Sequence, residues 1–430
     1  MFAPAHLGGS YVMEFERGPI NYTRPSDRDP VARLQQRINA GEAKLVFEPK
    51  WGYLRSLLEN LGVPVESQSL IFSKTSFQLH KIGPATPRAL YFNDDAYVGF
   101  VQRGDVLELS AVDPERGAIF YTLEQQATEK PKFERHDDCL QCHASGNTLG
   151  VPGHLIRSVT VDAEGQPLFI GSGFITDHRS PFPERWGGWY VTGTHGSERH
   201  MGNVIVKDRS RPDHFDTEAG ANITSLSKLG VDVGPYVAPH SDIVALMVLE
   251  HQTRMHNLIT RVSFETRLAL DWQESMEKSF GKDVNQPSRW SDSTQRRIFG
   301  PAETLLRYML FVEEPPLRSP VQGTSGFQQD FPKNGPRDSR KRSLRDLDLN
   351  KRLFRYPLSF LVYSSAFDAI PEPAKGYVFR RLAEVLSGAD QRPEFSSLSS
   401  EDRTAIKEIL AETKPEFAEA LKASESGPAR

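Results

Sequence analysis

The sequence predicts an α+β protein in which an antiparallel, β-rich first half precedes a mostly helical second half. From residue 69, short runs of β-branched and aromatic residues alternate with turns rich in Asn, Asp, Gly and Pro. From residue 239, apolar residues recur at helical spacing instead. A chain of 430 residues is longer than one average domain. We therefore predict a β-rich domain at 1–236 and a helical domain at 237–430.

The β-rich domain is expected to begin with an irregular arm and two short helices. Residues 1–30 show little periodicity and contain several turn formers. Pro30 suits the first turn of a helix that continues to about Ala40. A second helix is predicted at 51–61, where Gly62 ends it.

Five strands of an antiparallel meander are expected next, because each short β-type run is bounded by turn residues. They lie at 70–72, 90–92, 97–101, 106–109 and 118–122. Later runs of the same type predict a hairpin and two further strands. These runs occupy 155–161, 168–170, 186–193 and 203–206.

The second domain is predicted to be helical from the spacing of its apolar residues. The expected helices lie at 242–276, 301–312, 373–387, 400–412 and 415–422. Between them, residues 315–345 contain many Pro, Gly, Ser and basic residues, which predicts a disordered loop.

Charge and composition limit the classes of partner. The formal net charge is -4, so nothing in the composition suggests a nucleic-acid or acidic-membrane partner. No run of apolar residues is long enough to cross a bilayer. We therefore expect neither nucleic-acid binding nor a membrane span.

The strongest chemical signal is a Cys-x-x-Cys-His motif formed by Cys139, Cys142 and His143. This pattern attaches a c-type haem, because its two thiols bond to the porphyrin vinyl groups and the histidine binds the iron. Cys139 and Cys142 are the only two cysteines of the chain. The motif therefore predicts one covalent haem c, carried on a loop between strands.

Other interpretations of the cysteine pair stay open. A redox-active disulfide is typical of a βαβ setting, which is absent around this motif. A zinc site needs further ligands, which His136 and His154 are able to supply. A chance match to the motif is the third alternative.

The segment from Cys139 to His143 resembles the cytochrome c superfamily, over those five residues only. Small cytochromes c are all-helical and carry the motif near the N-terminus, and this chain departs from both features. A haem loop between strands is similar, at the level of the fold, to periplasmic haem-binding sensor domains of PAS-like shape. The resemblance implies a large bacterial mono-haem c-type cytochrome.

The resemblance also implies a location outside the cytoplasm, because haem c is attached there. The first ten residues lack the basic and apolar regions of a signal peptide. We expect a periplasmic or otherwise extracytoplasmic protein, with its export signal missing from the given sequence or upstream of the given start.

The second axial ligand of the iron would decide the chemistry, and the histidines point to one region. Ten of the twelve histidines lie between His136 and His256. Within that region, one glycine-containing loop carries His195, His200 and Met201. We predict that His200 or Met201 coordinates the iron, with His195 behind them, or that these are ordinary loop residues.

Further candidates lie on the helix predicted at 242–276. His251 and Met255 fall on its apolar stripe and His256 lies beside it, so they are either distal ligands or core residues. Elsewhere, Trp186 is predicted to pack on the porphyrin. Arg157 and Arg185 are predicted to pair with the haem propionates through their guanidinium groups.

The predicted function is electron transfer by a single haem, either as a periplasmic cytochrome or as a redox subunit that serves a partner protein. The alternative is an open distal site, as in a haem peroxidase or oxidase-like enzyme or a haem-based sensor. No catalytic residue is assigned from the sequence.

Overall fold

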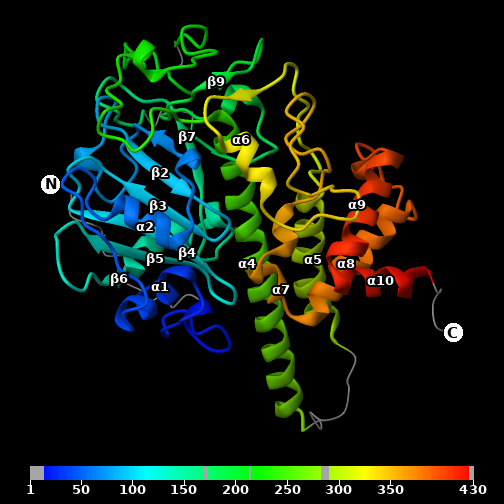
Figure 1. Cartoon of the computed structure of the whole chain (residues 1–430). Coiled ribbons are helices and arrows are strands. Elements are labelled where there is room, and N and C mark those ends of the chain that lie inside the picture. Colours follow the sequence, from blue (N-terminus) through cyan, green and yellow to red (C-terminus); the bar gives the residue numbers. More distant parts are fainter. Residues whose placement is uncertain (1–13, 169–172, 213–214, 282–289, 426–430) are drawn as a thin grey trace.

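The structure is a computed structural model that describes residues 14–168, 173–212, 215–281 and 290–425. It confirms a mixed α+β architecture with an antiparallel sheet in the first half and helices in the second. Figure 1 shows the sheet on one side, a long central helix beside it, and the C-terminal helices on the far side of that helix. Near the start of the described chain, the side chains of Phe15 and Tyr22 are buried, and Phe15 packs against Phe264 of the central helix.

The main sheet is a meander of six strands that pair in chain order. The strands are β1 (Ser69–Ile71), β2 (Arg88–Phe92), β3 (Ala96–Phe100), β4 (Val106–Asp113), β5 (Gly117–Glu124) and β6 (Phe133–Arg135). The five predicted strands are confirmed. The sixth, β6, was not predicted, because two of its three residues, Glu134 and Arg135, are charged and do not stand out as a β-type run.

One face of the sheet is covered by two helices, α1 (Pro30–Asn39) and α2 (Leu54–Leu61), as predicted. The carboxylate of Asp29 caps α1 by accepting hydrogen bonds from its first backbone N–H groups. Gly62 ends α2 in a left-handed conformation, with φ of 63°. The apolar residues on this face, among them Val98 and Leu109, form a core with both helices.

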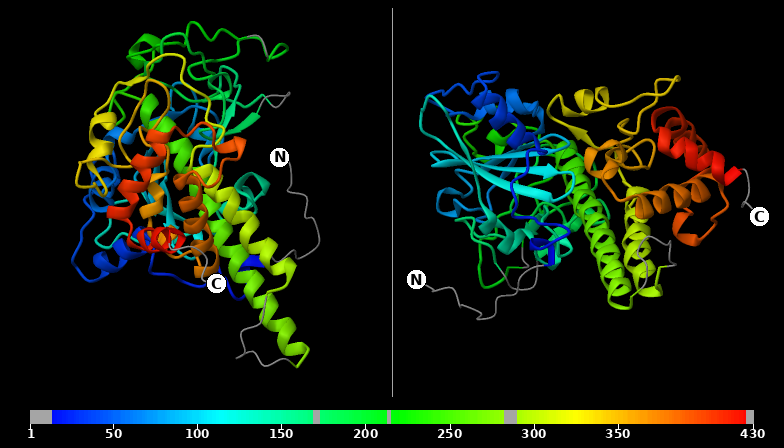
Figure 2. Two further views of the ribbon diagram at one scale, coloured as in Figure 1. Left: turned by 90° about the vertical axis from the view of Figure 1, so that its right-hand side faces the viewer. Right: turned by 90° about the horizontal axis from the view of Figure 1, so that it is seen from below.

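The opposite face of the sheet packs partly against the central helix, α4 (Ile243–Ser279). This 37-residue helix confirms the prediction and is capped by Asp242. Its first turns are buried on all sides, so they need apolar partners all round. Figures 1 and 2 show that its other end projects beyond the sheet together with α5.

One continuous core joins the two predicted domains. Phe92 and Tyr97 from the sheet belong to the same apolar cluster as the first turns of α4 and the helices that follow. The predicted boundary at 236/237 therefore does not separate two independent cores. The two cores are continuous because the N-terminal half of α4 packs against the sheet on one side and against the later helices on the other.

The helices of the second half are mostly where the sequence predicts them. They are α5 (Asp292–Met309), α6 (Phe327–Asp330), α7 (Ser365–Asp368), α8 (Glu372–Ser387), α9 (Ser400–Thr413) and α10 (Pro415–Glu425). The start of α5 was predicted at residue 301. It lies earlier because Ser291 caps it and Pro301 is accommodated inside the helix. None of the described helices is both long and apolar enough to cross a membrane.

Residues 315–345 were predicted to be a disordered loop. Most of their backbone is irregular, as in a loop, but long-range contacts hold the segment against the rest of the protein. The segment holds α6 and the short strand β10 (Gln322–Gly323). Arg345 is buried, bonds to both carboxylate oxygens of Asp94 and stacks over Phe331. Such long-range partners order a segment whose composition alone resembles that of a loop.

The strand predicted at 186–193 is also wrong for most of its length. Only β9 (Gly193–Thr194) is a strand, and it pairs with β10. Trp186 and Gly188 have positive φ angles, 65° and 80°, which break an extended run. The backbone turns there because Gly187 lies against the backbone of Val159, where a Cβ atom would come within 2.7 Å of its carbonyl oxygen.

The later hairpin also differs in its second strand. β7 (Ile156–Val159) pairs with β8 (Gly173–Thr176). Nearer the turn, the Leu168 backbone N–H donates to the Thr160 carbonyl at 2.9 Å and Val161 forms an antiparallel bridge with Pro167, so the chain folds back where the hairpin was predicted. Of the run predicted at 168–170, residues 169 and 170 lie outside the described residues. The run predicted at 203–206 contains no strand.

Candidate functional site

The two cysteines lie on one short helical segment. Cys139 ends a turn at Asp137–Cys139, and α3 (Leu140–His143) follows it directly. Both thiols are free, with Cys139 half-buried and Cys142 exposed. Residues three apart on a helical turn are neighbours, so the two cysteines lie on the same side of the segment. We call residues 137–154 the Cys-His loop.

The imidazole of His143 is held in one tautomer. Its Nδ1 lies 2.9 Å from the carbonyl oxygen of Gly153, so Nδ1 carries the proton and donates it to that oxygen. Burial lowers the pKa of His143, which keeps the ring neutral at pH 7. Its Nε2 therefore presents a lone pair. A histidine prepared in this way is the usual form of a metal ligand.

The Cys-His loop is fixed to the central helix. The side-chain amide of Asn257 on α4 accepts a hydrogen bond from the His154 backbone N–H at 2.8 Å and donates one to the His154 carbonyl at 2.6 Å. A Cβ atom at Gly153 would lie 2.2 Å from the Asn257 oxygen. Gly153 is therefore needed for the loop to approach α4 this closely.

The environment of Cys139 does not suit a redox-active disulfide. Burial raises the pKa of its thiol to about 11, and the carboxylates of Glu108 and Asp138 act in the same direction. The thiol is therefore protonated at pH 7. Reactive cysteines have the opposite property, because positive groups lower their pKa.

The zinc alternative also finds little support. Nε2 of His154 lies 2.6 Å from the Ser110 hydroxyl, and Nε2 of His136 lies 2.8 Å from the Thr122 hydroxyl. Within the described parts of the chain, no three His, Cys, Asp or Glu side chains are grouped to hold a metal ion. A haem iron needs only one or two protein ligands, so this criterion does not bear on haem.

Charged side chains of the sheet face the Cys-His loop. Arg88 on β2 and Glu108 on β4 form an ion pair at 3.5 Å, and the Ser76 hydroxyl donates to Glu108. Arg88, Glu108 and the predicted propionate partner Arg157 all lie near enough to His143 to shift its pKa. The structure therefore places Arg157 within electrostatic range of His143, and it adds Arg88 and Glu108.

An apolar side chain is exposed beside the same loop. Phe77 is 74% exposed, and its ring centroid lies 6.5 Å from that of His136. On the buried side, the ring of Phe120 packs 4.8 Å from that of His143. Exposed large apolar groups next to a prepared ligand are typical of a site that an apolar group covers.

The predicted distal ligands do not meet the Cys-His loop. Nδ1 of His195 donates to the Glu198 carbonyl at 2.9 Å, and its Nε2 accepts from the Asn222 N–H at 3.0 Å. Both nitrogens of His195 are therefore in use. His200 is buried, with its ring packed edge-on to that of Trp186, and burial lowers its pKa to about 3.

The strand β7 separates this group from the loop. The Ser158 hydroxyl contacts the Met201 sulfur at 3.7 Å, whereas the adjacent Arg157 lies near His143. Adjacent side chains of a strand point to opposite faces. Met201 and His200 therefore lie behind β7. Among the described residues, no hydrogen bond or ring contact joins either of them to His143.

Arg185 and Trp186 belong to a buried cluster under α4 and not to the loop. Nη1 of Arg185 lies 3.1 Å from the Glu250 carboxylate, and its Nη2 donates to the His178 carbonyl. Glu250 is fully buried, which raises its pKa to about 7 although Arg185 opposes the shift. This buried carboxylate engages the guanidinium that the sequence assigned to a propionate.

The candidates on α4 are core residues. Nδ1 of His251 lies 2.8 Å from Nδ1 of His178, and its Nε2 lies 2.8 Å from the Ser359 hydroxyl. Nε2 of His256 lies 2.9 Å from the Asp94 carbonyl, and Met255 is fully buried. The structure brings none of the three to His143.

Sequence reasoning missed Arg88, Glu108, Phe120 and Gly153. The only available signal was the alternation along β4 and β5, which puts Glu108 and Phe120 on one face of the sheet. Comparisons with models of known protein families, with curated proteins and with solved structures found no match to this chain.

Proposed function

We propose that this protein is an extracytoplasmic mono-haem c-type cytochrome that transfers electrons. Cys139 and Cys142 would hold the porphyrin through thioether bonds, and Nε2 of His143 would bind the iron. The observation that carries the proposal is the 2.9 Å bond from His143 Nδ1 to the Gly153 carbonyl, which leaves Nε2 free as a ligand.

The surroundings of the Cys-His loop support the same group. Exposed Phe77, next to His136, supplies apolar surface for a porphyrin. Arg88 and Arg157 supply cations for two propionates. Cysteine thiols, one imidazole, apolar surface and arginines together fit a haem c better than they fit zinc or a disulfide.

A bound haem supplies a one-electron iron couple, and the chain sets how that couple behaves. The Gly153 carbonyl orients the His143 ring and raises its basicity as a ligand. The exposed Cys142 leaves the attachment side of the loop open to solvent. Such openness suits electron exchange with a redox partner protein.

A second candidate is a haem protein with a free sixth position. It is favoured by one observation, the placement of His200 and Met201 behind β7. An iron with one protein ligand binds small molecules, as in a peroxidase, an oxidase or a sensor. The suggested likeness to PAS-like sensor domains belongs to this candidate.

The test is export of the full chain in a bacterial host that attaches haem c. Intact mass should show one covalent haem, and the Cys139→Ser/Cys142→Ser double variant should show none. Expression without the attachment machinery is the control. If the chain carries no haem in a host that matures an established c-type cytochrome, the proposal is wrong. A low-spin ferric spectrum supports electron transfer, and a high-spin one supports the second candidate.

A further inference from the structure

A cavity of about 240 Å³ lies between α4, α5 and the Cys-His loop. Arginines from three parts of the chain line it, together with Glu313 and Tyr308. The arginines are Arg179, Arg254, Arg261 and Arg307. We propose that this arginine cavity binds an oxyanion of the size and charge of phosphate. The proposal does not depend on the haem.

The cations in the arginine cavity are only partly neutralised. Arg179 is well paired, because two of its nitrogens bond to the Asp177 carboxylate at 2.7 and 3.0 Å. Arg254 reaches the same carboxylate only at 3.9 Å. Within the described residues, Arg261 has no ion pair within 4.0 Å. Positive charge therefore exceeds negative charge on this side of the cavity.

Arg307 is also loosely paired. It lies 3.5 Å from Glu313 and 3.8 Å from Glu394. Glu313 is shared with Arg179, at 3.8 Å, and 61% of its side chain is exposed. A guanidinium has five N–H donors, so long contacts to shared carboxylates leave donors available to a ligand.

Electrostatics at Arg254 support the same conclusion. Burial lowers the pKa of Arg254, and the positive charges of Arg179 and Arg261 lower it further, although Asp177 opposes them. An anion in the cavity would relieve the repulsion among these three groups. Planar guanidinium groups recognise phosphate through paired hydrogen bonds, which gives the ligand class.

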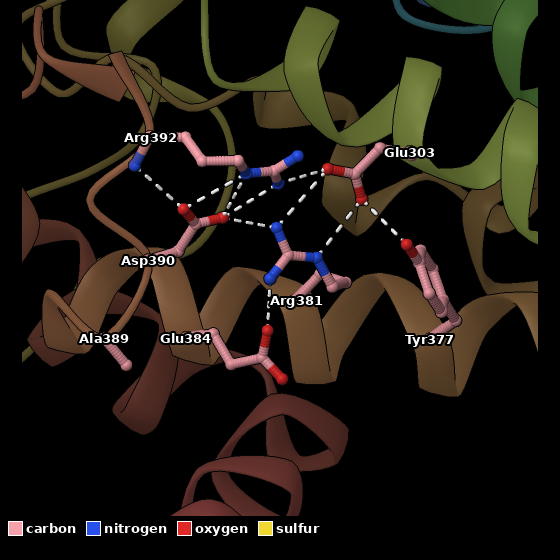
Figure 3. Close-up of a pocket in the computed structure, with 7 residues that line it drawn as sticks. All are labelled: Glu303, Tyr377, Arg381, Glu384, Ala389, Asp390 and Arg392. Atoms are coloured by element: carbon pink, nitrogen blue, oxygen red, sulfur yellow. Dashed lines mark hydrogen bonds and ion pairs between the residues drawn. The ribbon is translucent and has the colours of Figure 1, made fainter. Parts of the chain in front are cut away.

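A second cavity shows what a fully paired arrangement looks like. It measures about 480 Å³ and lies between α5 and α8 (Figure 3). Arg381 bonds there to Glu303, Glu384 and Asp390. Arg392 bonds to Glu303 and Asp390. Its arginines are already occupied by carboxylates, so this cavity provides a matched control.

The experiment is calorimetric titration of the full-length protein with inorganic phosphate at constant ionic strength. We expect saturable binding and a rise in the unfolding temperature with phosphate. Arg261→Gln should raise the Kd at least about tenfold, since it removes one charged partner. Arg254→Gln should act in the same direction, and Arg392→Gln in the paired cavity should leave the Kd unchanged.

Arg261 is the decisive position because its side chain has no ion pair to lose, so its variant should fold normally. Absence of saturable phosphate binding in the wild type would overturn the proposal. So would an unchanged Kd in folded Arg261→Gln, or an equal loss of binding in Arg392→Gln. Acetate serves as a further arm, and equal affinity for acetate would show that charge alone is recognised and would also overturn it.

Discussion

Two histidine-rich regions lie on opposite sides of β7, and they differ in what their ring nitrogens contact. In the Cys-His loop, His143 uses Nδ1 in a hydrogen bond and leaves Nε2 free, and the exposed Phe77 lies beside the loop. Behind the strand, His195 uses both nitrogens in hydrogen bonds, and the ring of His200 is buried beside it. The density of histidines in a sequence therefore locates a polar interior. Among the described residues, buried rings such as His200 also carry unpaired nitrogens, so the exposure of the ring separates a candidate ligand from a core residue.

The largest expected effect is on haem ligation. If the proposed haem is bound, His143→Ala should remove its proximal ligand and change the visible spectrum of the exported protein completely, while the two thioether bonds should remain. His200→Leu should leave the spectrum as it is, because His200 lies behind β7. Spectra of both variants make the measurement. A shift from low spin to high spin in His200→Leu would show that His200 is a ligand, and would contradict its assignment to the closed region behind β7.

Acid should have the next largest effect, and it acts on the closed region. Burial lowers the pKa of His200 and of His251 from 6.5 to about 3. Stability from the neutral rings is therefore present above pH 6.5 and is lost as the pH falls toward 3. Each unit of lowered pKa is worth about 1.4 kcal/mol, so acid should unfold the protein. Denaturation midpoints measured from neutral to acidic pH check this, and an unchanged midpoint near pH 4 contradicts it.

Removal of the buried cation should be costly by itself. Arg185→Met leaves the Glu250 carboxylate without its partner, which costs about 3–5 kcal/mol of unfolding free energy. Denaturant titration measures the loss. Arg199→Met is the matched control, because Arg199 pairs with Glu218 at the surface, and its effect should be much smaller. Equal losses in the two variants would show that the Arg185 region is not closed.

The smallest expected effect is at the attachment of the loop to α4. Asn257→Leu leaves the N–H and carbonyl of His154 without partners, at a cost of about 1–3 kcal/mol. Asn60→Leu is a control, because the Asn60 amide bonds to backbone carbonyls near the surface. Denaturant titration of both variants sharpens the comparison, and an unaltered stability in Asn257→Leu would show that the loop does not need the clamp.

The sequence predicted those parts of the fold that depend on local signals. The cap at Asp29, the period of α4 and the short runs of the meander were sufficient for α1, α4 and five strands. The strand predicted at 186–193 failed because the chain turns at Trp186 and Gly188, and the only trace of this turn in residue type is the pair Gly187-Gly188, which the strand prediction passed over. At 315–345 the sequence predicted a loop but not the contacts that hold it, because partners such as Asp94 are distant in sequence.

In the candidate site, too, the sequence predicted what depends on local signals and missed what depends on long-range packing. The thiols and His143 were predicted because their spacing along the chain is itself the signal. Arg88 and Glu108 were missed because only the register of β2, β3 and β4 brings them beside the loop. The proposed distal ligands were chosen by nearness to one another in sequence, and the intervening strand decides where they lie.

Three of the features described above meet on one short stretch of α4. Glu250 holds the buried pair, Arg254 and Arg261 line the arginine cavity, and Asn257 clamps the Cys-His loop. Backbone amides of this stretch are shielded by all three at once, so we expect them to exchange hydrogen with solvent only through global opening. A ligand bound in the arginine cavity or at the Cys-His loop would then slow hydrogen exchange along the whole stretch. The stretch would therefore behave as one cooperative unit.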